Sequence, residues 1–318
     1  MKKRVIVSTA VLLIAVIVLV LISILTQTLW SFGRNDSELH DKDSKYAISY
    51  SESLMDIDID SPQGFVYSVS DDTIIFTKGE HKVIHPGSTT KLLSAVYALT
   101  ILSPNEIITP GDELDLVKEG SSIAYINSGH KLSVEMLVEG MLLPSGNDAA
   151  YVLAAAAGRK LANNPTLDGK RAVEAFINGM NAYAKEIGLC GTNFTCPDGY
   201  ADETHYTTTE DMVIISILAL ENNLIVKYAS LPKDDVVYAS GHTNTWHNTN
   251  KLLDPNSVYY NPYVIGLKTG SLDKEYCLVF AFRFEDGREY VAGVFGHDEK
   301  NTRYEDAHAI IKALEDNQ

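Results

Sequence analysis

The chain has 318 residues, of which 45% are hydrophobic and 21% are charged, and its formal net charge is −16. This length fits one large domain or two small ones, and the apolar content is enough to bury a sizeable core. The acidic balance excludes nucleic acid as a partner, because binding phosphate groups requires a basic surface. The 3 cysteines and 9 histidines show no metal-ligand spacing, so we expect neither a metal ion nor another cofactor.

The N-terminus has the pattern of a membrane anchor. Lys2, Lys3 and Arg4 precede an uncharged, mostly apolar run from Val5 to Leu25. The run is long enough to span a bilayer and exceeds the roughly 7–15 apolar residues of a signal peptide. The basic flank should stay in the cytoplasm. We expect residues 1–4 to be cytoplasmic and residues 5–26 to form a single transmembrane helix in the cell membrane. The alternative is secretion after cleavage.

After this segment, residues 27–58 are polar and acidic, which indicates an extracytoplasmic linker. A folded domain is therefore expected over residues 59–318. Its first elements are two β-rich runs, Phe65–Val69 and Thr73–Thr77. They are separated by Ser70-Asp71-Asp72, which predicts a hairpin.

Helices dominate the middle of the chain. The run from Leu92 to Leu102 is apolar on nearly all sides, which predicts a helix in the middle of the domain. Further helices are predicted from apolar spacing and end signals. Three of them cover residues 134–143, 173–187 and 302–314. Another is capped by Asn147 or Asp148 and ends at Gly158. The last covers residues 212–219 and follows a capping box formed by Thr207 and Glu210.

The last third contains strands. Val264–Thr269, Tyr276–Phe284 and Tyr290–Phe295 read as strands, and Glu285-Asp286-Gly287 joins the last two as a hairpin turn. With the first hairpin, this order predicts an α/β (α+β) fold. Its antiparallel sheet is built from both ends of the domain, with flanking helices and an inserted helical subdomain.

The cysteines leave one question open. Cys190 and Cys196 are close enough in sequence for a disulfide, but two thiols are an equal alternative. Cys277 lies in an apolar strand pattern and is expected in the core.

A serine and a lysine three residues apart lie on one face of a helix, and the serine can then act as a nucleophile with the lysine as its base. This S-x-x-K pattern occurs at four places: Ser88 to Lys91, Ser128 to Lys131, Ser230 to Lys233 and Ser271 to Lys274. Among these, the pair in Pro86-Gly87-Ser88-Thr89-Thr90-Lys91 opens a buried helix. We therefore select Ser88 and Lys91.

Two more short motifs follow in order. Ser145-Gly146-Asn147 lies on a predicted loop between two helices, and Lys268-Thr269-Gly270 ends a predicted strand. Both tripeptides are expected together by chance in roughly one chain in a hundred of this length. Their order and structural context make coincidence rarer still.

The three motifs together resemble those of serine β-lactamases and penicillin-binding proteins. From about Gly64 to Leu314 the chain resembles the serine D-alanyl-D-alanine carboxypeptidases, which are low-molecular-mass penicillin-binding proteins. Further stretches carry this resemblance: Leu143-Pro144 and Asp148-Ala149-Ala150 around the second motif, Pro197-Asp198-Gly199-Tyr200, His205-Tyr206-Thr207-Thr208, Asn248-Thr249-Asn250 and Cys277-Leu278-Val279. The resemblance implies the β-lactamase/transpeptidase-like fold.

The resemblance also implies a reaction and its catalytic residues. Ser88 would attack the carbonyl between the last two D-alanines of a peptidoglycan stem peptide and form an acyl-enzyme. Lys91 would be its base, with a pKa lowered by apolar surroundings and by Lys268. Ser145 would pass a proton to the leaving amine, and Asn147 would orient the substrate or Lys91. β-Lactam antibiotics would be covalent inhibitors.

Substrate binding is implied in the same way. Lys268 and Thr269 would bind the terminal carboxylate, and Gly270 would let the substrate backbone approach the strand. The backbone N–H groups of Ser88 and Ser271 would form the oxyanion hole.

One departure from the family concerns the carboxylate pocket. Many members have an arginine after the strand that precedes the last helix, where this chain has His297-Asp298. Arg303 is the nearest arginine, and we expect it to take part in substrate binding.

Two alternatives remain at this point. A class A-like β-lactamase would need a deacylating glutamate in E-x-x-L-N, and Glu174 to Asn178 is similar to that pattern. Because Glu174 lies within an amphipathic helix, we expect it on a solvated face. The other alternative is a non-catalytic penicillin-binding wall protein, although each motif residue is present.

Overall fold

The computed structural model describes residue 46 and residues 48–79, 82–200 and 203–317, which belong to one compact unit. The predicted transmembrane segment at residues 5–26 lies outside the described residues. Among the described residues, no single helix has the length and hydropathy needed to cross a membrane. One sharply bent pair of neighbouring helices, Thr209–Glu221 and Asn223–Ala229, meets the criteria jointly.

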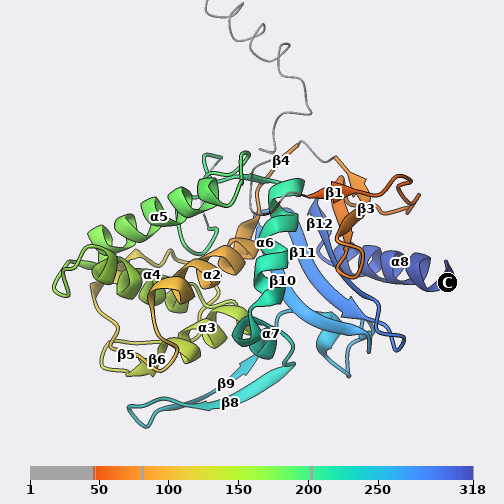
Figure 1. The fold of residues 1–318 in the computed structure, drawn as a ribbon. Coiled ribbons are helices and arrows are strands. Elements are labelled where there is room, and N and C mark those ends of the chain that lie inside the picture. The colour runs from red at the N-terminus through yellow and green to blue at the C-terminus, as the bar shows by residue number, and fades with distance from the viewer. Residues whose placement is uncertain (1–45, 47, 80–81, 201–202, 318) are drawn as a thin grey trace, which may run out of the picture. The chain divides into compact units, whose positions relative to one another are not determined.

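A six-stranded sheet forms the middle of the part that the structure describes, in the order β1-β3-β2-β12-β11-β10 (Figure 1). β1 pairs with β3 in parallel, and the other neighbours are antiparallel. Its strands are β1 (Ser49–Tyr50), β2 (Gln63–Ser68), β3 (Thr73–Lys78), β10 (Val264–Leu272), β11 (Glu275–Arg283) and β12 (Glu289–His297). The predicted sheet from both ends of the domain is confirmed.

Shorter strands form two-stranded pairs outside this sheet. These pairs are β4 (Val83–Ile84) with β7 (Thr207–Thr208), β5 (Ile107–Ile108) with β6 (Leu132–Ser133), and β8 (Lys233–Val237) with β9 (Thr243–His247). The β8–β9 pair is a hairpin that sequence patterning did not predict.

Helices surround the sheet, as Figure 1 shows, with α6 across one face and α8 on the other. The α-helices are α2 (Lys91–Ile101), α3 (Val134–Leu142), α4 (Asn147–Leu161), α5 (Gly169–Glu186), α6 (Thr209–Glu221), α7 (Asn223–Ala229) and α8 (Thr302–Asp316). The described residues also form the short 3₁₀ helices η2 (Gly87–Thr90), η3 (Asp112–Leu116) and η4 (Lys251–Leu253). The predicted helices are thus confirmed, with boundaries that differ by a few residues.

Both faces of the sheet are buried, which explains why β11 reads as a continuous apolar run. Successive residues of a strand point to opposite faces. Val279 and Ala281 belong to the core shared with α2 and α6, whereas Phe280 and Phe282 belong to the core under α8. The sheet therefore lies between two hydrophobic layers.

The start of the domain differs from the prediction of residue 59. Ser49–Tyr50 already pairs with β3, and the Met55 N–H donates to the Ile75 carbonyl at 2.7 Å. Ile57 is buried in the core under α8. The linker prediction is wrong for these residues, because pairing at a sheet edge uses backbone groups and tolerates the polar composition seen there.

Two helix starts also differ from the prediction. The residue that caps α4 is Gly146 instead of Asn147 or Asp148, and it makes no side-chain cap bond. Thr208 caps α6 by accepting from the Asp211 N–H, one residue later than the predicted capping box at Thr207. In both cases the side chain predicted as a cap makes other hydrogen bonds.

The structure has no disulfide between Cys190 and Cys196. Cys196 is a buried thiol, and its Sγ lies 3.7 Å from His205 Nδ1. Cys277 is buried in β11, as predicted.

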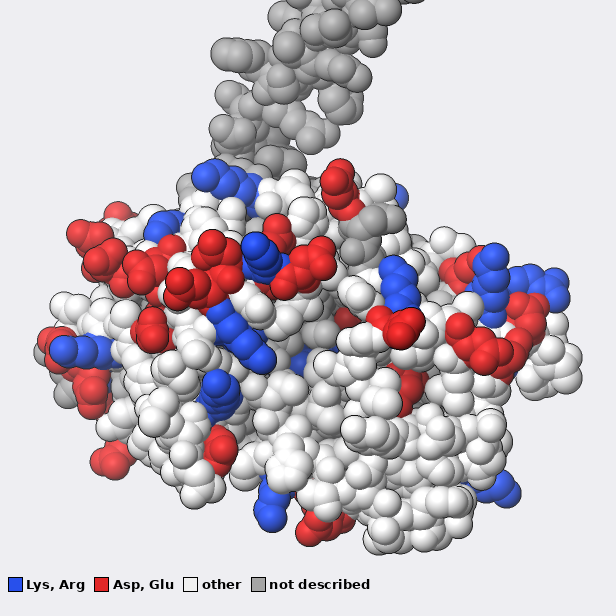
Figure 2. Space-filling view, turned by 180° about the vertical axis from the view of Figure 1, so that it is seen from behind, with Lys and Arg blue, Asp and Glu red and all other residues white. Residues whose placement is uncertain are grey.

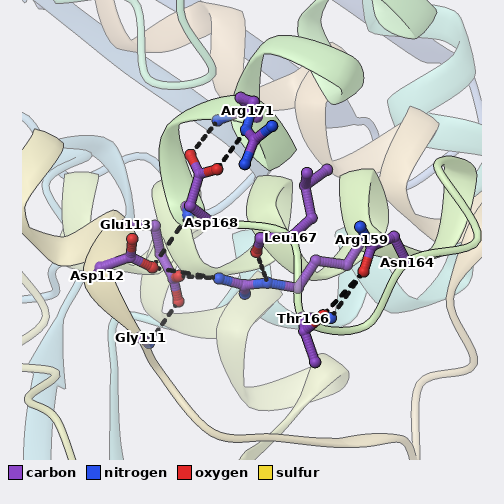
Figure 3. Close-up of polar contacts among 10 residues, drawn as sticks. Gly111, Asp112, Glu113, Arg159, Asn164, Thr166, Leu167, Asp168 and Arg171 are labelled. Carbon is purple, nitrogen blue, oxygen red and sulfur yellow. Dashed lines mark hydrogen bonds and ion pairs between the residues drawn. The ribbon is translucent and has the colours of Figure 1, made fainter.

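Charged groups connect η3 to α4 and α5 beside a groove of about 900 Å³ (Figure 3). Glu113 is fully buried, and Arg159 Nη2 donates to its Oε2 at 2.7 Å. Arg159 Nε donates to the Leu167 carbonyl at 2.9 Å, and Arg171 pairs with Asp168. Glu113 is therefore buried with a paired charge, which offsets the cost of its burial, and these opposite charges do not form a binding surface of one sign.

Figure 2 shows acidic and basic side chains intermixed along the upper part of one face, with few charges below. Opposite charges that lie side by side largely cancel at distances beyond a Debye length. The large net charge is therefore not concentrated into one acidic patch on this face.

The contact between α4 and α5 gives a prediction for stability. A Cβ atom added at Gly158 would lie 1.8 Å from the Ala172 carbonyl oxygen, so the two helices must separate in Gly158→Ala. We expect a loss of about 2–3 kcal/mol of unfolding free energy, measured by urea denaturation of residues 43–318. Asn178→Ala, at an exposed position of α5, should stay within about 0.5 kcal/mol of the wild type. Equal stabilities would contradict the close helix contact.

Candidate active site

Ser88 and Lys91 meet at the start of the central helix. Ser88 lies in η2, and Lys91 is the first residue of α2. Residues three apart are aligned in a 3₁₀ turn, and Lys91 Nζ lies 2.9 Å from Ser88 Oγ. Ser88 is half-buried, whereas the Lys91 side chain is completely buried. The structure thus brings the predicted nucleophile and base into hydrogen-bonding contact.

Two oxygen atoms hold the Lys91 amine from other sides. Nζ lies 2.7 Å from Asn147 Oδ1 and 2.9 Å from the Asp198 carbonyl oxygen. Burial lowers the pKa of Lys91 to about 8, and the negative charge of Asp198 partly opposes this effect. Part of this amine is therefore neutral near physiological pH.

Ser145 lies on the turn before α4 and has φ of +61°. This left-handed conformation costs a serine on the order of 1–3 kcal/mol, a strain that is typical of functional sites. Ser145 is 4% exposed, and its Oγ has no hydrogen bond to the residues that the structure describes. Because Gly146 is the capping residue of α4, a capping role does not account for the presence of a serine at position 145. Its role in proton transfer stays a prediction.

Asp148 fixes the segment that lies against this turn. Its Oδ1 accepts from the Ala124 N–H and its Oδ2 from the Ile126 N–H, both at 2.8 Å. The Asn147 N–H donates to the Ser122 carbonyl at 2.8 Å. Residues 121–126 therefore form one wall of the site. Sequence reasoning missed this wall, because the segment shows no periodicity.

Lys268 is the second cationic group of the motifs and lies on β10. Its side chain is 1% exposed, and Nζ donates to the Thr269 carbonyl at 3.1 Å. Burial, followed by the positive charges of Lys91 and Arg303, lowers its pKa well below the ordinary value. Thr269 Oγ1 lies 2.6 Å from Thr249 Oγ1, a neighbour to which no role was assigned from the sequence.

Glycines allow β10 to lie directly against η2. A Cβ atom added at Gly270 would lie 2.5 Å from the Pro86 carbonyl oxygen, which excludes any side chain there. Gly87 has φ of +50°, and a Cβ atom on it would be 3.1 Å from the Ser271 nitrogen. The residue before Ser88 is thus adjacent to the Ser271 N–H. This proximity suits the predicted oxyanion hole, which stays a prediction.

Arg303 reaches the end of β10 from α8. It is 2% exposed, and Nη1 donates to the carbonyl groups of Gly270 at 2.7 Å and Cys277 at 3.1 Å. A weaker contact of 3.4 Å joins Nη1 to Ser271 Oγ. Through these contacts Arg303 holds the end of the strand in place. It also places a positive charge close enough to Lys268 to lower the pKa of that lysine. Direct contact of Arg303 with substrate stays a prediction.

The fold and the site can be compared with known proteins. Residues 51–298 match the family model described as D-alanyl-D-alanine carboxypeptidase. The D-alanyl-D-alanine carboxypeptidase of Streptomyces sp. (strain K15) is 31% identical, over 78% of this chain and 84% of that protein. D-alanyl-D-alanine carboxypeptidase DacF of Bacillus subtilis (strain 168) is 26% identical, over 70% of this chain and 54% of its own length.

Solved structures agree with this result. The crystal structure of the Streptomyces K15 DD-transpeptidase aligns with a TM-score of 0.71 and 28% identity, covering 82% of this chain and 98% of that one. Penicillin-binding protein D2 from Listeria monocytogenes, at 24% identity and a TM-score of 0.65, shares the fold. The predicted β-lactamase/transpeptidase-like fold is confirmed, and the chain belongs to the D-alanyl-D-alanine carboxypeptidase family.

Proposed function

We propose that this protein is a serine DD-peptidase that removes the terminal D-alanine from peptidoglycan stem peptides ending in D-Ala-D-Ala. The observation that carries this proposal is the contact of a half-buried serine with a buried lysine of lowered pKa, Ser88 with Lys91. Family membership supports the substrate class. The reaction needs no metal ion or cofactor.

The acylation step uses the groups around Lys91. Ser88 Oγ attacks the carbonyl carbon between the two D-alanines while its proton moves to Lys91 Nζ. The backbone N–H groups of Ser88 and Ser271 would stabilise the oxyanion. When the C–N bond breaks, the leaving D-alanine amine takes a proton, for which Ser145 is the relay. The product is an ester between Ser88 and the shortened peptide.

Deacylation returns the enzyme to its starting state. Water attacks the ester carbonyl, Ser88 recovers its proton and the shortened stem peptide leaves. A β-lactam offers a strained amide to the same nucleophile, and its opened ring stays attached, so no leaving group departs. β-Lactams are therefore expected to be covalent inhibitors that are released slowly from Ser88.

Water is one possible acceptor, and an amine is the other. The similar Streptomyces protein carries both names, carboxypeptidase and DD-transpeptidase. The same acyl-enzyme serves both reactions, and the acceptor decides between hydrolysis and cross-linking. We place hydrolysis first because the family model carries the carboxypeptidase name.

A class A-like β-lactamase is disfavoured by the position of Glu174. This residue is exposed on α5. The sequence prediction of a solvated helix face is therefore confirmed, and Glu174 is not a buried base of the kind that fast deacylation requires.

The nucleophile assignment gives a direct test. Wild-type protein should be labelled covalently by a fluorescent penicillin and should release D-alanine from a pentapeptide ending in D-Ala-D-Ala. Ser88→Ala should lose both activities by at least about 10³-fold, because it removes the attacking oxygen. Ser128→Ala, at an exposed S-x-x-K serine, is the matched control.

Two results would contradict the proposal. Labelling of Ser88→Ala as strong as that of wild type would refute the nucleophile. Labelled wild type that cuts cross-linked muropeptides but releases no D-alanine would make the protein an endopeptidase.

The Lys91 pKa predicts a pH dependence. Since only the neutral amine can accept the Ser88 proton, the rate of acylation by penicillin should rise with pH. It should reach half of its maximum near pH 8, the pKa of Lys91, and level off above it. Stopped-flow acylation measures this profile. Lys91→Arg should be slow at every pH, because a guanidinium keeps its proton. A wild-type rate that falls as pH rises would refute Lys91 as the base.

We also propose that residues 5–26 anchor the protein in the cell membrane with the catalytic domain outside. Support comes from the apolar run after Lys2, Lys3 and Arg4 and from the extracytoplasmic location of peptidoglycan. The full chain should sediment with membranes and resist extraction by alkaline carbonate, whereas a variant without residues 1–32 should remain in the supernatant. A shortened band in the medium would favour cleavage instead.

A further inference from the structure

Neutral Lys91 must direct its lone pair at one group only. A neutral amine has two N–H donors and one lone pair. The Asp198 carbonyl oxygen and Asn147 Oδ1 are pure acceptors, at 2.9 and 2.7 Å from Nζ. When both accept an N–H, the lone pair points at the remaining neighbour, Ser88 Oγ, at 2.9 Å. The orientation of the Asn147 amide therefore matters for the chemistry.

A rotated amide would interfere with this arrangement. If the Asn147 NH₂ group faced Lys91, it would donate to the lysine lone pair and compete with the Ser88 hydroxyl. The observed orientation needs an acceptor for the NH₂ group on the opposite side. Ser121 provides it, because Asn147 Nδ2 donates to Ser121 Oγ at 2.9 Å. Among the described residues, this is the acceptor that the Nδ2 group contacts.

The segment that carries Ser121 is held in place from two directions. On one side, Asp148 binds the N–H groups of Ala124 and Ile126. On the other side, the β8–β9 hairpin contacts the same segment through Trp246 Nε1 and Asn244 Nδ2, which both donate to the Ala124 carbonyl at 3.0 Å. Ala124 is fully buried. The wall that carries Ser121 is therefore fixed relative to Asn147.

We propose that Ser121 is a positioning residue that keeps the Asn147 amide in the orientation in which Lys91 accepts a proton only from Ser88. It acts on acylation through Asn147 and Lys91, without contact to the reacting atoms. This proposal rests on the assignment of Ser88 and Lys91 as nucleophile and base.

The test compares Ser121→Ala with Ser121→Thr in the detergent-solubilised full chain. Ser121→Ala removes the acceptor of the Asn147 NH₂ group, and Asn147 is only 4% exposed, so solvent cannot easily replace that acceptor. The second-order rate of acylation by penicillin should fall about tenfold, the usual effect of losing one buried hydrogen bond. Ser121→Thr keeps the hydroxyl and should recover most of the rate. Ser128→Ala should acylate like wild type.

The pH profile separates positioning from a general loss of structure. Asn147 Oδ1 favours the charged form of Lys91, so loosening this contact should lower the lysine pKa. The acid limb of the acylation profile of Ser121→Ala should therefore move to lower pH while its plateau falls. Thermal unfolding measured in parallel should differ little between the alanine and threonine variants.

Each other outcome counts against the proposal. Acylation of Ser121→Ala at the wild-type rate overturns it, as does a threonine variant as slow as the alanine variant. A slower rate with an unshifted acid limb assigns Ser121 a purely structural role. If penicillin labels wild type at Ser88 but the Ser121 variants behave in one of these ways, the inference about Ser121 fails and the proposed function stands.

Discussion

The burial of the Lys91 amine is the constraint on which the rest of the site depends. An amine without exposure to solvent is costly unless its hydrogen bonds are satisfied, and three separate parts of the chain supply the partners. Ser88 comes from η2, Asn147 from the start of α4 and the Asp198 carbonyl from the loop after α5. The same burial lowers the pKa of the lysine, so the packing that encloses Lys91 also prepares it as the base.

Close backbone contacts keep these parts together. Gly199, directly after Asp198, has φ of +81°, and a Cβ atom there would lie 1.8 Å from the Gly87 carbonyl oxygen. Gly270 approaches Pro86 on the other side of η2 in the same way. The 3₁₀ turn that carries Ser88 is therefore enclosed between a loop and a strand from distant parts of the sequence. A side chain at either glycine would displace the turn that carries the nucleophile.

The sequence predicted those features that depend on local pattern. The apolar α2, the amphipathic α5 and the alternating runs of β11 and β12 were visible from spacing, and the three motifs located Ser88, Ser145 and Lys268. Non-local contacts were not visible. Ser121 approaches Asn147 through backbone bonds between an irregular segment and a helix start, and the irregular segment has no distinctive pattern. Ser49–Tyr50 was missed for a similar reason, because its sheet pairing involves no apolar alternation.

The charges of the site give a physical reason for the predicted carboxylate pocket. Lys268 lies beside two other cations, Lys91 and Arg303, which together with burial disfavour its charged form. Among the described residues, no carboxylate forms an ion pair with Lys268. A substrate carboxylate bound there would offset the repulsion and restore the charge on Lys268. The bound carboxylate and the proton gained by Lys268 carry opposite charges, so Lys91, held by neutral oxygen atoms, would face little additional net charge. Binding of the correct terminus would thus relieve the repulsion at Lys268 and leave Lys91 able to accept the Ser88 proton.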